Sequence, residues 1–448
     1  MDWLHDAARR NPHAPALIVG ESTVPYGDLD GLADRVAAAV AAAGPQLGSR
    51  VAYWGEQNLR AVAAAWGIPR AGAWAVPLST RLPAATAMAL TRRAGVGGLW
   101  ALASDAEMHR LRPALGGPPQ GGPPDPRSRF VVFSSGTGGR QRGVVLSGAN
   151  VAAAVAASRA RIGNESHHRW LCVLPTSHVG GLSILWRCAE RGAAVVLEER
   201  FDAVRVAGLL AEGQVECASL VPTMLRRILE AHPGPYHQVV AVLVGGGPAD
   251  PALLERALDA GLPVLATYGS TETCSQVATV VPGAERASLG TVGPPLDGFE
   301  VRIGPGGRIE VRGPAVAAGD LDGVDRPVAS WVMMGDLGGF DAEGRLVVRG
   351  RADRVVVTGG TNVHAEAVEQ VLADYPGLAD VHVRGEPDPE WGNAVVADVV
   401  VAEGHEFDAG EVASWAGGRL ARHEIPKRWR VVESIERTEL GKHPGAGG

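Results

Sequence analysis

Apolar and polar residues alternate in short blocks along the first part of the chain, and these blocks predict alternating helices and strands. Residues Leu29–Ala43 carry apolar side chains at helical spacing and are followed by a Gly-Pro pair, which is typical of a helix end. The apolar runs Val51–Trp54 and Ala73–Leu78 predict buried strands, and Ala61–Trp66 between them predicts a helix. This alternation favours an α/β fold in which helices cover sheets.

Later apolar runs continue the pattern and change character after Asp353. Up to that residue, further strands are predicted at Phe130–Phe133, Leu171–Leu174, Ala241–Val244 and in the run that ends at Tyr268. Beyond it, a helix is predicted at Ala365–Leu372, among strands at Val355–Val357, Val381–Val383 and Val395–Val401. The last hundred or so residues therefore predict a small α+β domain.

Composition limits the possible partners and location. The 448 residues suffice for two or three domains, and the formal net charge of -7 provides no basic face for nucleic acid. No apolar run reaches membrane-spanning length, and the first residues contain no apolar signal core. We therefore expect a cytoplasmic protein whose number of subunits the sequence does not indicate. Neither a disulfide framework nor a structural zinc is expected, because no CxxC pair occurs among Cys172, Cys188, Cys217 and Cys274.

The glycine- and serine-rich segment Ser134–Val144, with the sequence SSGTGGRQRGV, is the strongest candidate for a binding loop. It follows a predicted strand and precedes a helix expected within Leu146–Ile162, with Asn150 as its N-cap. Glycine permits close approach of the backbone to a ligand, the hydroxyls add donors, and Arg140 and Arg142 add positive charge. Such a loop suits a polyphosphate, although an ordinary surface turn has a similar composition.

The loop matches neither of two common phosphate-binding templates. A Walker loop ends in Gly-Lys followed by Ser or Thr, whereas Gly139 and Gly143 are followed by Arg140 and Val144. The dinucleotide fingerprint requires a third glycine where Gln141 stands. The residues therefore indicate phosphate binding without identifying its class.

A histidine follows the strand predicted at Leu171–Leu174. His178 lies at a bend that Gly180 and Gly181 are expected to loosen, before a helix begins. Open α/β sheets place ligand contacts at bends of this kind. A lone histidine is nevertheless more often structural than catalytic, so both interpretations stay open.

Two further strand ends carry ligand-compatible residues. Gly245–Gly247 follow the strand at Ala241–Val244, where glycine backbone either lies flat against a planar ligand or forms an ordinary turn. Tyr268, Thr271 and Glu272 place an aromatic ring, a hydroxyl and a carboxylate within five residues. They suit an adenine and a phosphate-bound magnesium ion, although Ser-Thr-Glu also begins ordinary helices.

These segments, in this order, resemble the motifs of adenylate-forming enzymes, the superfamily of acyl-CoA synthetases, adenylation domains and luciferases. The resemblance continues through the stretch Trp331–Leu372. The family usually has threonine where Gly138 stands and lysine where Arg142 stands. Arginine retains the positive charge of lysine but not its geometry.

The resemblance implies a large N-terminal AMP-binding domain over residues 1–350 and a small mobile C-terminal lid over residues 351–448. The hinge would lie near Asp353, and Gly359 and Gly360 would belong to the lid face used in the thiol step. Lys442, near the Gly-rich end, would be the mobile lysine of the adenylation step.

The resemblance also implies a two-step reaction that consumes ATP. A carboxylate first forms an acyl-adenylate, and the thiol of coenzyme A then displaces AMP, with Mg²⁺ held by Glu272. The implied catalytic residues are Lys442, Arg142, Thr271, Glu272 and His178. The implied nucleotide-binding residues are Ser134, Ser135, Gly136, Thr137, Gly138, Gly139, Gly246, Gly247, Pro248, Tyr268, Gly269, Thr271, Asp336 and Arg351.

Within the superfamily, the segments LPTSHVGGLSIL, SLVPTML, VGGGPA and YGSTETCSQ look like those of the o-succinylbenzoate-CoA ligases of menaquinone biosynthesis. By position, His178, Ser183 and Thr223 would line the pocket for the acid. Three alternatives stay open: another acyl- or aryl-CoA ligase, an adenylation enzyme that loads a carrier protein, and a non-catalytic nucleotide-binding relative.

Overall fold

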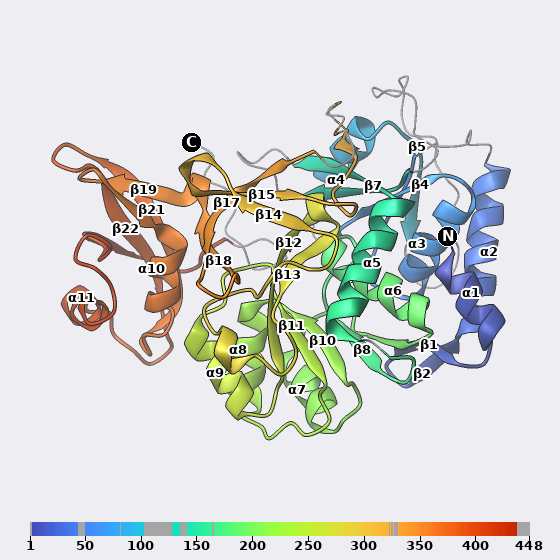
Figure 1. The fold of residues 1–448 in the computed structure, drawn as a ribbon, viewed down its shortest axis with the longest axis horizontal. Coiled ribbons are helices and arrows are strands. Elements are labelled where there is room, and N and C mark those ends of the chain that lie inside the picture. The colour runs from blue at the N-terminus through green and yellow to red at the C-terminus, as the bar shows by residue number, and fades with distance from the viewer. Residues whose placement is uncertain are drawn as a thin grey trace.

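A computed structural model of the chain describes residues 2–43, 50–80, 82–102, 128–134, 141–163, 165–321, 323, 326 and 330–436. Figure 1 shows a large part built around three sheets and a smaller part, formed by C-terminal residues, at its left. Helices and sheets are mixed throughout the large part, so the predicted α/β class is confirmed.

The largest sheet has eight strands, of which the inner six run parallel. In spatial order they are β13 (Ser275–Thr279), β12 (Val264–Ser270), β11 (Ala241–Val244), β10 (Cys217–Leu220), β8 (Arg169–Cys172), β9 (Ala194–Leu197), β1 (Pro15–Val19) and β2 (Ser22–Pro25). Every residue of β9, β10 and β11 is buried, as expected for parallel strands covered on both faces.

A six-stranded sheet lies above the first in Figure 1. Its order is β16 (Gly319–Asp320), β7 (Arg142–Ser147), β6 (Ser128–Ser134), β4 (Trp74–Leu78), β3 (Arg50–Gly55) and β5 (Val96–Leu102). The sequence predicted that the loop after β6 leads directly into a helix, and this prediction is wrong. The segment after the loop first forms β7, which pairs antiparallel with β6, so Arg142 stands on a strand.

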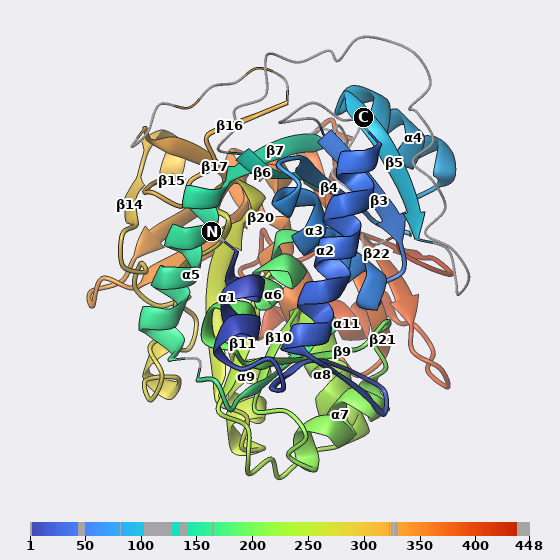
Figure 2. The same cartoon turned by 90° about the vertical axis from the view of Figure 1, so that its right-hand side faces the viewer.

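The helices cover these two sheets on several sides (Figures 1 and 2). Those of the large part are α1 (Trp3–Arg10), α2 (Tyr26–Ala42), α3 (Leu59–Arg70), α4 (Ala84–Arg93), α5 (Gly148–Ile162), α6 (Val179–Arg191), α7 (Ala203–Ala211), α8 (Pro222–Ala231) and α9 (Pro251–Asp259). The helix α6 contacts β8 and β9, and α9 contacts β12. The fully buried Trp170 of β8 belongs to the resulting core.

The predicted start of α5 was wrong. Ser147, rather than Asn150, is the N-cap, because the Ser147 hydroxyl accepts from the Asn150 N–H at 3.1 Å. The Asn150 side chain accepts in turn from the Ser147 N–H at 2.9 Å, which completes a reciprocal capping box. Gly180 and Gly181 also differ from expectation, because they lie in the first turn of α6 instead of loosening a bend.

The third sheet and two small C-terminal sheets complete the chain. The third sheet consists of β14 (Glu300–Ile303), β15 (Arg308–Arg312), β17 (Val332–Phe340) and β18 (Leu346–Arg351). The smaller sheets are β19 (Val355–Thr358) with β20 (Thr361–His364), and β21 (Leu378–Asp388) with β22 (Gly392–Val401) and β23 (Arg428–Val431). With α10 (Ala365–Leu372) and α11 (Ala409–Gly417) they enclose a separate hydrophobic cluster.

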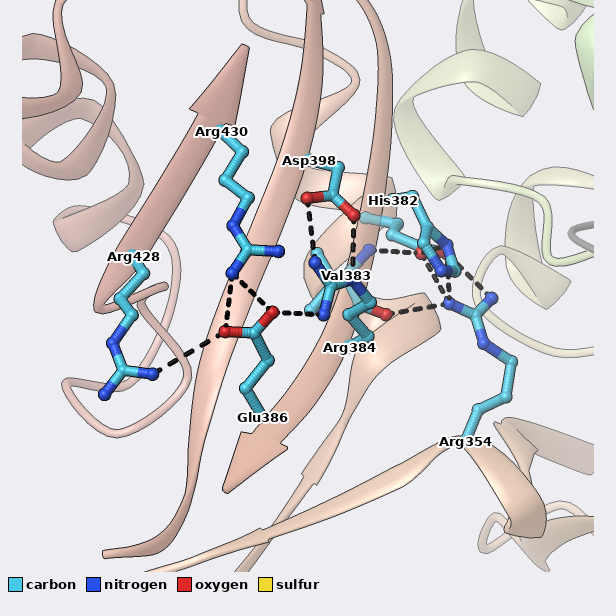
Figure 3. A network of polar contacts seen from close by, with 9 residues as sticks. Arg354, His382, Val383, Arg384, Glu386, Asp398, Arg428 and Arg430 are labelled. Atoms are coloured by element: carbon cyan, nitrogen blue, oxygen red, sulfur yellow. Dashed lines mark hydrogen bonds and ion pairs between the residues drawn. The ribbon is translucent and has the colours of Figure 1, made fainter. Parts of the chain in front are cut away.

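Charged side chains connect the strands of this C-terminal part (Figure 3). Arg384 on β21 donates to Asp398 on β22 at 2.8 Å, and Arg430 on β23 donates to Glu386 at 2.9 Å. Arg354 approaches from the other side and donates to the Val383 carbonyl at 2.9 Å. These contacts link β21 to its neighbours and to the segment just before β19.

Two further features concern the cysteines and the length of the helices. All four cysteines are buried with free thiols. Among the helices in the described part of the chain, none is both long enough and apolar enough to span a bilayer.

The packing of α3 against α2 generates a stability prediction. A Cβ atom at Gly67 would lie 2.5 Å from the Ala33 carbonyl oxygen and 2.5 Å from Val36 Cβ. We expect Gly67→Ala to lower the free energy of unfolding by about 1–3 kcal/mol, because the two helices must move apart. Denaturant unfolding measures the change.

Gly208 provides the matched control for this substitution. It lies within α7, and no heavy atom beyond its own helix lies within 4 Å of an added Cβ. Gly208→Ala should therefore raise the free energy of unfolding by up to about 1 kcal/mol through helix propensity. Equal effects of the two substitutions would contradict the close approach of α2 and α3.

Candidate functional site

The end of β6 and the start of β7 frame the expected phosphate loop. Ser134 ends β6, and its buried Oγ has no hydrogen-bond partner among the described residues. Opposite it, Arg142 donates from Nη2 to the Asp320 carboxylate at 2.7 Å. The remaining loop residues named from the sequence lie outside the described residues: Ser135, Gly136, Thr137, Gly138 and Gly139.

A hydrogen bond joins the first sheet to the third at the expected adenosine site. The Tyr268 hydroxyl on β12 donates to Asp336 Oδ2 on β17 at 2.8 Å. Burial raises the pKa of Tyr268 well above its ordinary value, and the neighbouring Asp336 carboxylate adds to the effect. The phenol therefore stays protonated and keeps Asp336 at the mouth of the site, where a carboxylate can accept from ribose hydroxyls.

Arg351 at the end of β18 lies beside the same carboxylate. Its Nη1 is 3.9 Å from Asp336 Oδ1, and its Nη2 donates to Asp353 at 2.8 Å. An added Cβ at Gly335 would collide with the Arg351 guanidinium, so glycine leaves the space that this side chain occupies. Asp336, Arg351 and the expected hinge residue Asp353 thus form one group.

The turn after β12 places two more predicted residues at this edge. Thr271 and Glu272 lie in a 3₁₀ turn over Thr271–Thr273, and the Glu272 carbonyl accepts from the Ala317 N–H at 2.8 Å. An added Cβ at Gly269 would collide with the Ser275 carbonyl of β13. Glycine is therefore required for the two strands to approach as closely as they do.

A glycine turn after β11 faces the start of α8. Gly246 has φ +79°, a left-handed value that favours glycine. An added Cβ there would lie 3.3 Å from a methyl group of Val221, and one at Gly247 would lie 3.9 Å from Pro222. Pro248 follows as an exposed residue. The turn therefore presents glycine backbone toward the start of α8.

A buried cation lies beneath the residues expected to bind the acid. His178 is the N-cap residue of α6, and the Ser183 hydroxyl one turn later donates to the Gly180 carbonyl at 2.9 Å. Arg187, a further turn on, donates from Nη2 to the Ser183 oxygen at 2.9 Å and lies over the Trp170 ring at 4.5 Å. Burial lowers the pKa of Arg187 to about 10, which leaves it protonated at neutral pH.

Arg187 borders a small cavity between α5, α6 and β13. The cavity has a volume of about 10 Å³, close to the room that one water needs. Its lining residues are Ala154, Val155, Ser158, Ser183, Trp186, Arg187, Cys274, Ser275 and Gln276. Ser158 donates to the Gln276 side chain at 2.8 Å across this region.

Not every predicted residue joins this arrangement. Thr223 is exposed in the first turn of α8 and is not among the residues that line the cavity. Gly359 and Gly360 lie in the turn after β19, where Gly359 packs against Trp391. Lys442 lies outside the described residues.

The fold brings three charged residues to the site that no sequence motif indicated: Arg187, Asp320 and Arg326. The one available signal was for Arg187, a charge in the otherwise apolar stretch Leu185–Cys188. A charged residue in an apolar stretch either lies exposed at the surface or is buried because it has a function.

Comparisons with known proteins give matches to both the large part and the C-terminal part of the chain. The family model described as AMP-binding enzyme matches residues 4–319, and that of the AMP-binding enzyme C-terminal domain matches residues 367–442. A 2-succinylbenzoate-CoA ligase of Listeria monocytogenes serotype 4b is 37% identical over 321 residues, which make up 70% of this chain and 68% of the relative.

Two solved structures of o-succinylbenzoate coenzyme A synthetase from Bacillus subtilis are also similar. The complex with the acyl-adenylate intermediate is 28% identical, with a TM-score of 0.87 over 99% of this chain and 96% of that chain. The complex with ATP and magnesium ion is 29% identical, with a TM-score of 0.88 over 99% and 98% of the two chains.

The group around Asp336 generates a binding prediction. Asp336→Ala should weaken binding of ATP and of AMP by about 1.5–3 kcal/mol, the scale of hydrogen bonds to a charged group. Both nucleotides should be affected alike, because both contain the ribose. Titration calorimetry measures the change.

Tyr268→Phe is the matched control, because it removes only the hydroxyl that orients Asp336. Its effect on nucleotide binding should be about 1 kcal/mol or less. Unchanged affinity in the Asp336→Ala variant would remove this carboxylate from the site.

Proposed function

The chain belongs to the AMP-binding enzyme family, and we propose that it is an AMP-forming ligase that joins 2-succinylbenzoate to coenzyme A. The observation that carries the proposal is the meeting of Tyr268, Asp336, Arg351 and Glu272 at one edge of the largest sheet. Open α/β sheets bind ligands at the carboxyl ends of their strands, where Tyr268 and the turn with Glu272 lie. The matches to ATP-dependent CoA ligases over both parts of the chain support the reaction.

In the first step, a carboxylate oxygen of the acid attacks the α-phosphorus of ATP. The bond between that phosphorus and the bridging oxygen of the β-phosphate breaks, and pyrophosphate leaves. Arg142 lies at the start of β7 beside the expected phosphate loop, where its charge offsets the negative charge of the triphosphate. Asp336 holds the ribose, and the buried Ser134 hydroxyl supplies a donor for a phosphate oxygen.

The residues also suit the magnesium ion that accompanies ATP. Mg²⁺ binds through one or two carboxylates together with phosphate oxygens, and Glu272 provides a carboxylate in the turn next to the expected phosphates. The bound ion offsets phosphate charge as pyrophosphate departs. The position of Thr271 in the same turn suits a hydroxyl contact to the α-phosphate.

In the second step, the thiol sulfur of coenzyme A attacks the carbonyl carbon of the acyl-adenylate. The thiol proton is released to a base, the bond from the carbonyl carbon to the AMP oxygen breaks, and AMP leaves. His178 lies at the N-terminus of α6, close in the chain to the residues that line the cavity, which suits a contact with the acyl group.

We further propose that the chain divides into an AMP-binding domain, residues 1–350, and a lid, residues 351–448, hinged at Asp353. The separate hydrophobic cluster of the C-terminal part supports a unit that moves as one body. Lys442 would serve the first step, and the turn with Gly359 and Gly360 the second. A cytoplasmic location suits an enzyme that uses ATP and coenzyme A.

The choice of acid rests on the buried cation. 2-Succinylbenzoate carries two carboxylates, of which one reacts and the other remains charged. Arg187, held by its hydrogen bond to the Ser183 hydroxyl, offers a cationic donor at the cavity. A second carboxylate that reached this group would gain a charge-assisted hydrogen bond, whereas a monocarboxylic acid would not.

Formation of the CoA thioester tests the proposal directly. The purified protein, with ATP and Mg²⁺, should convert 2-succinylbenzoate faster than benzoate or a fatty acid. Exchange of pyrophosphate without transfer to CoA would favour an enzyme that loads a carrier protein. A lack of exchange with every acid in a panel would favour a non-catalytic nucleotide-binding protein.

Arg187 generates a specificity prediction. Arg187→Met should lower kcat/KM for 2-succinylbenzoate by about 10- to 100-fold, because a charged hydrogen bond is worth about 1.5–3 kcal/mol. The analogue 4-oxo-4-phenylbutanoate lacks the ring carboxylate, so the substitution should change its kcat/KM much less. Equal losses for both acids would contradict recognition of the second carboxylate by Arg187.

Lys442 generates a prediction about the separate half-reactions. Lys442→Ala should slow acyl-adenylate formation by about 10²–10³-fold, as loss of a preorganised charge-stabilising group does. Reaction of supplied acyl-adenylate with coenzyme A should stay almost unchanged. Asp353→Pro is the reciprocal variant and should impair the second step more, because proline fixes the torsion that the hinge must change. Equal slowing of both steps by Lys442→Ala would contradict a lid with two working positions.

A further inference from the structure

Two arginines flank one buried carboxylate where β7 meets β16. Asp320 is only 1% exposed, and Arg142 donates to its Oδ2 at 2.7 Å. Nη2 of Arg326 lies 3.8 Å from the same oxygen. One negative charge between two positive charges leaves the group with a net positive charge, so it retains the capacity to attract an anion.

Arg326 is held in a buried position with one donor unused. Its side chain is 11% exposed, and its backbone N–H donates to the Ala318 carbonyl at 2.7 Å. Its Nη1 is buried and has no hydrogen-bond partner among the described residues. Burial lowers the pKa of this guanidinium, and the Asp320 charge raises it. A buried donor without an acceptor is costly, so the position favours a ligand that supplies one.

Backbone hydrogen bonds fix this group against the nucleotide site. The Ala317 N–H donates to the Glu272 carbonyl at 2.8 Å, and the Leu321 N–H donates to the Gly143 carbonyl at 2.8 Å. The segment between them therefore runs from the turn with the expected magnesium ligand to β7, as the neighbouring positions of β16 and β7 in Figure 2 show.

The groups around Arg326 indicate that its ligand is the pair of phosphates that leave as pyrophosphate. Arg142 at the phosphate loop shares the Asp320 carboxylate with Arg326, and the turn with Glu272 is hydrogen-bonded to the segment just before β16. Both Arg142 and Glu272 face the triphosphate in the proposed function. The β- and γ-phosphates carry most of the charge of ATP and supply several acceptor oxygens. A guanidinium whose Nη1 has no acceptor in the described part of the chain suits such an oxygen, because its donors form a rigid fork.

We propose that Arg326 is a further phosphate-binding residue that contacts the β- or γ-phosphate of ATP, and that Asp320 positions both Arg326 and Arg142. The inference rests on the proposed function, and it assigns Arg326 to the first step alone. AMP lacks the β- and γ-phosphates, so its binding does not involve Arg326. The attack of coenzyme A on the acyl-adenylate is likewise independent of it.

Comparison of ATP with AMP tests the role of Arg326. Arg326→Gln should weaken binding of Mg-ATP by about 10- to 100-fold, the range for hydrogen bonds to charged groups, and leave AMP binding within about twofold. In pyrophosphate exchange, KM for pyrophosphate should rise by a similar factor. Thioester formation from supplied acyl-adenylate and coenzyme A should keep its rate.

Two further variants separate this role from general effects of charge and folding. Arg205→Gln on α7 removes the same charge from an exposed ion pair with Glu198 and should leave ATP binding unchanged. Arg326→Lys keeps the charge without the fork and should recover part of the ATP affinity. It also serves in place of Arg326→Gln if that variant does not fold.

The outcomes distinguish failure of this inference from failure of the proposed function. Equal losses of ATP and AMP affinity in Arg326→Gln would show a structural role and overturn the inference, as would unchanged ATP affinity. Absence of nucleotide binding by the unaltered protein would instead overturn the proposed function.

A double-mutant comparison tests the positioning role of Asp320. If Asp320 holds Arg326 toward the phosphates, Arg326→Gln should cost less ATP affinity in an Asp320→Asn background than in the unaltered protein. Equal costs in both backgrounds would overturn the positioning role. AMP binding by each variant reports whether the nucleotide site is still folded.

Discussion

The repulsion between two anions is the constraint on which the site depends. An acid carboxylate must approach a phosphate that is itself negatively charged, so positive charge must already be in place. The structure holds its guanidinium groups with carboxylates before any ligand arrives. Arg142 is paired with Asp320 at 2.7 Å, and Arg351 is paired with Asp353 at 2.8 Å. Groups held in this way need little reorganisation when charge develops.

The same constraint explains why the site lies at a junction of sheets rather than on one element. Tyr268 on the first sheet and Asp336 on the third meet through a hydrogen bond of 2.8 Å. Asp320 belongs to a strand of the second sheet, and its ladder partner is Val144 on β7. One apolar core contains residues of all three sheets, so the polar groups at the junction are fixed without having to stabilise the fold themselves.

Structural features that depend on the local residue pattern were predicted from the sequence, whereas features that depend on contacts between distant residues were missed. The strands before Ser134 and Tyr268 were predicted because continuous apolar runs mark buried strands. The N-cap of α5 was missed because Ser147 and Asn150 are both good capping residues, and the reciprocal pair of bonds decides between them. Asp320 could not be placed, because its partner Arg142 lies 178 residues away along the chain.

The contact between the C-terminal part and the rest of the chain bears on the proposed movement of the lid. Arg226 on α8 donates to Asp374 at 3.0 Å, beyond the end of α10. Asp250 lies beside Asp374, and burial together with a hydrogen bond to that carboxyl raises the pKa of Asp250. The repulsion between the Asp250 and Asp374 carboxyl groups offsets part of the attraction between Asp374 and Arg226. A polar contact weakened in this way can open between the two steps, whereas a shared apolar core could not.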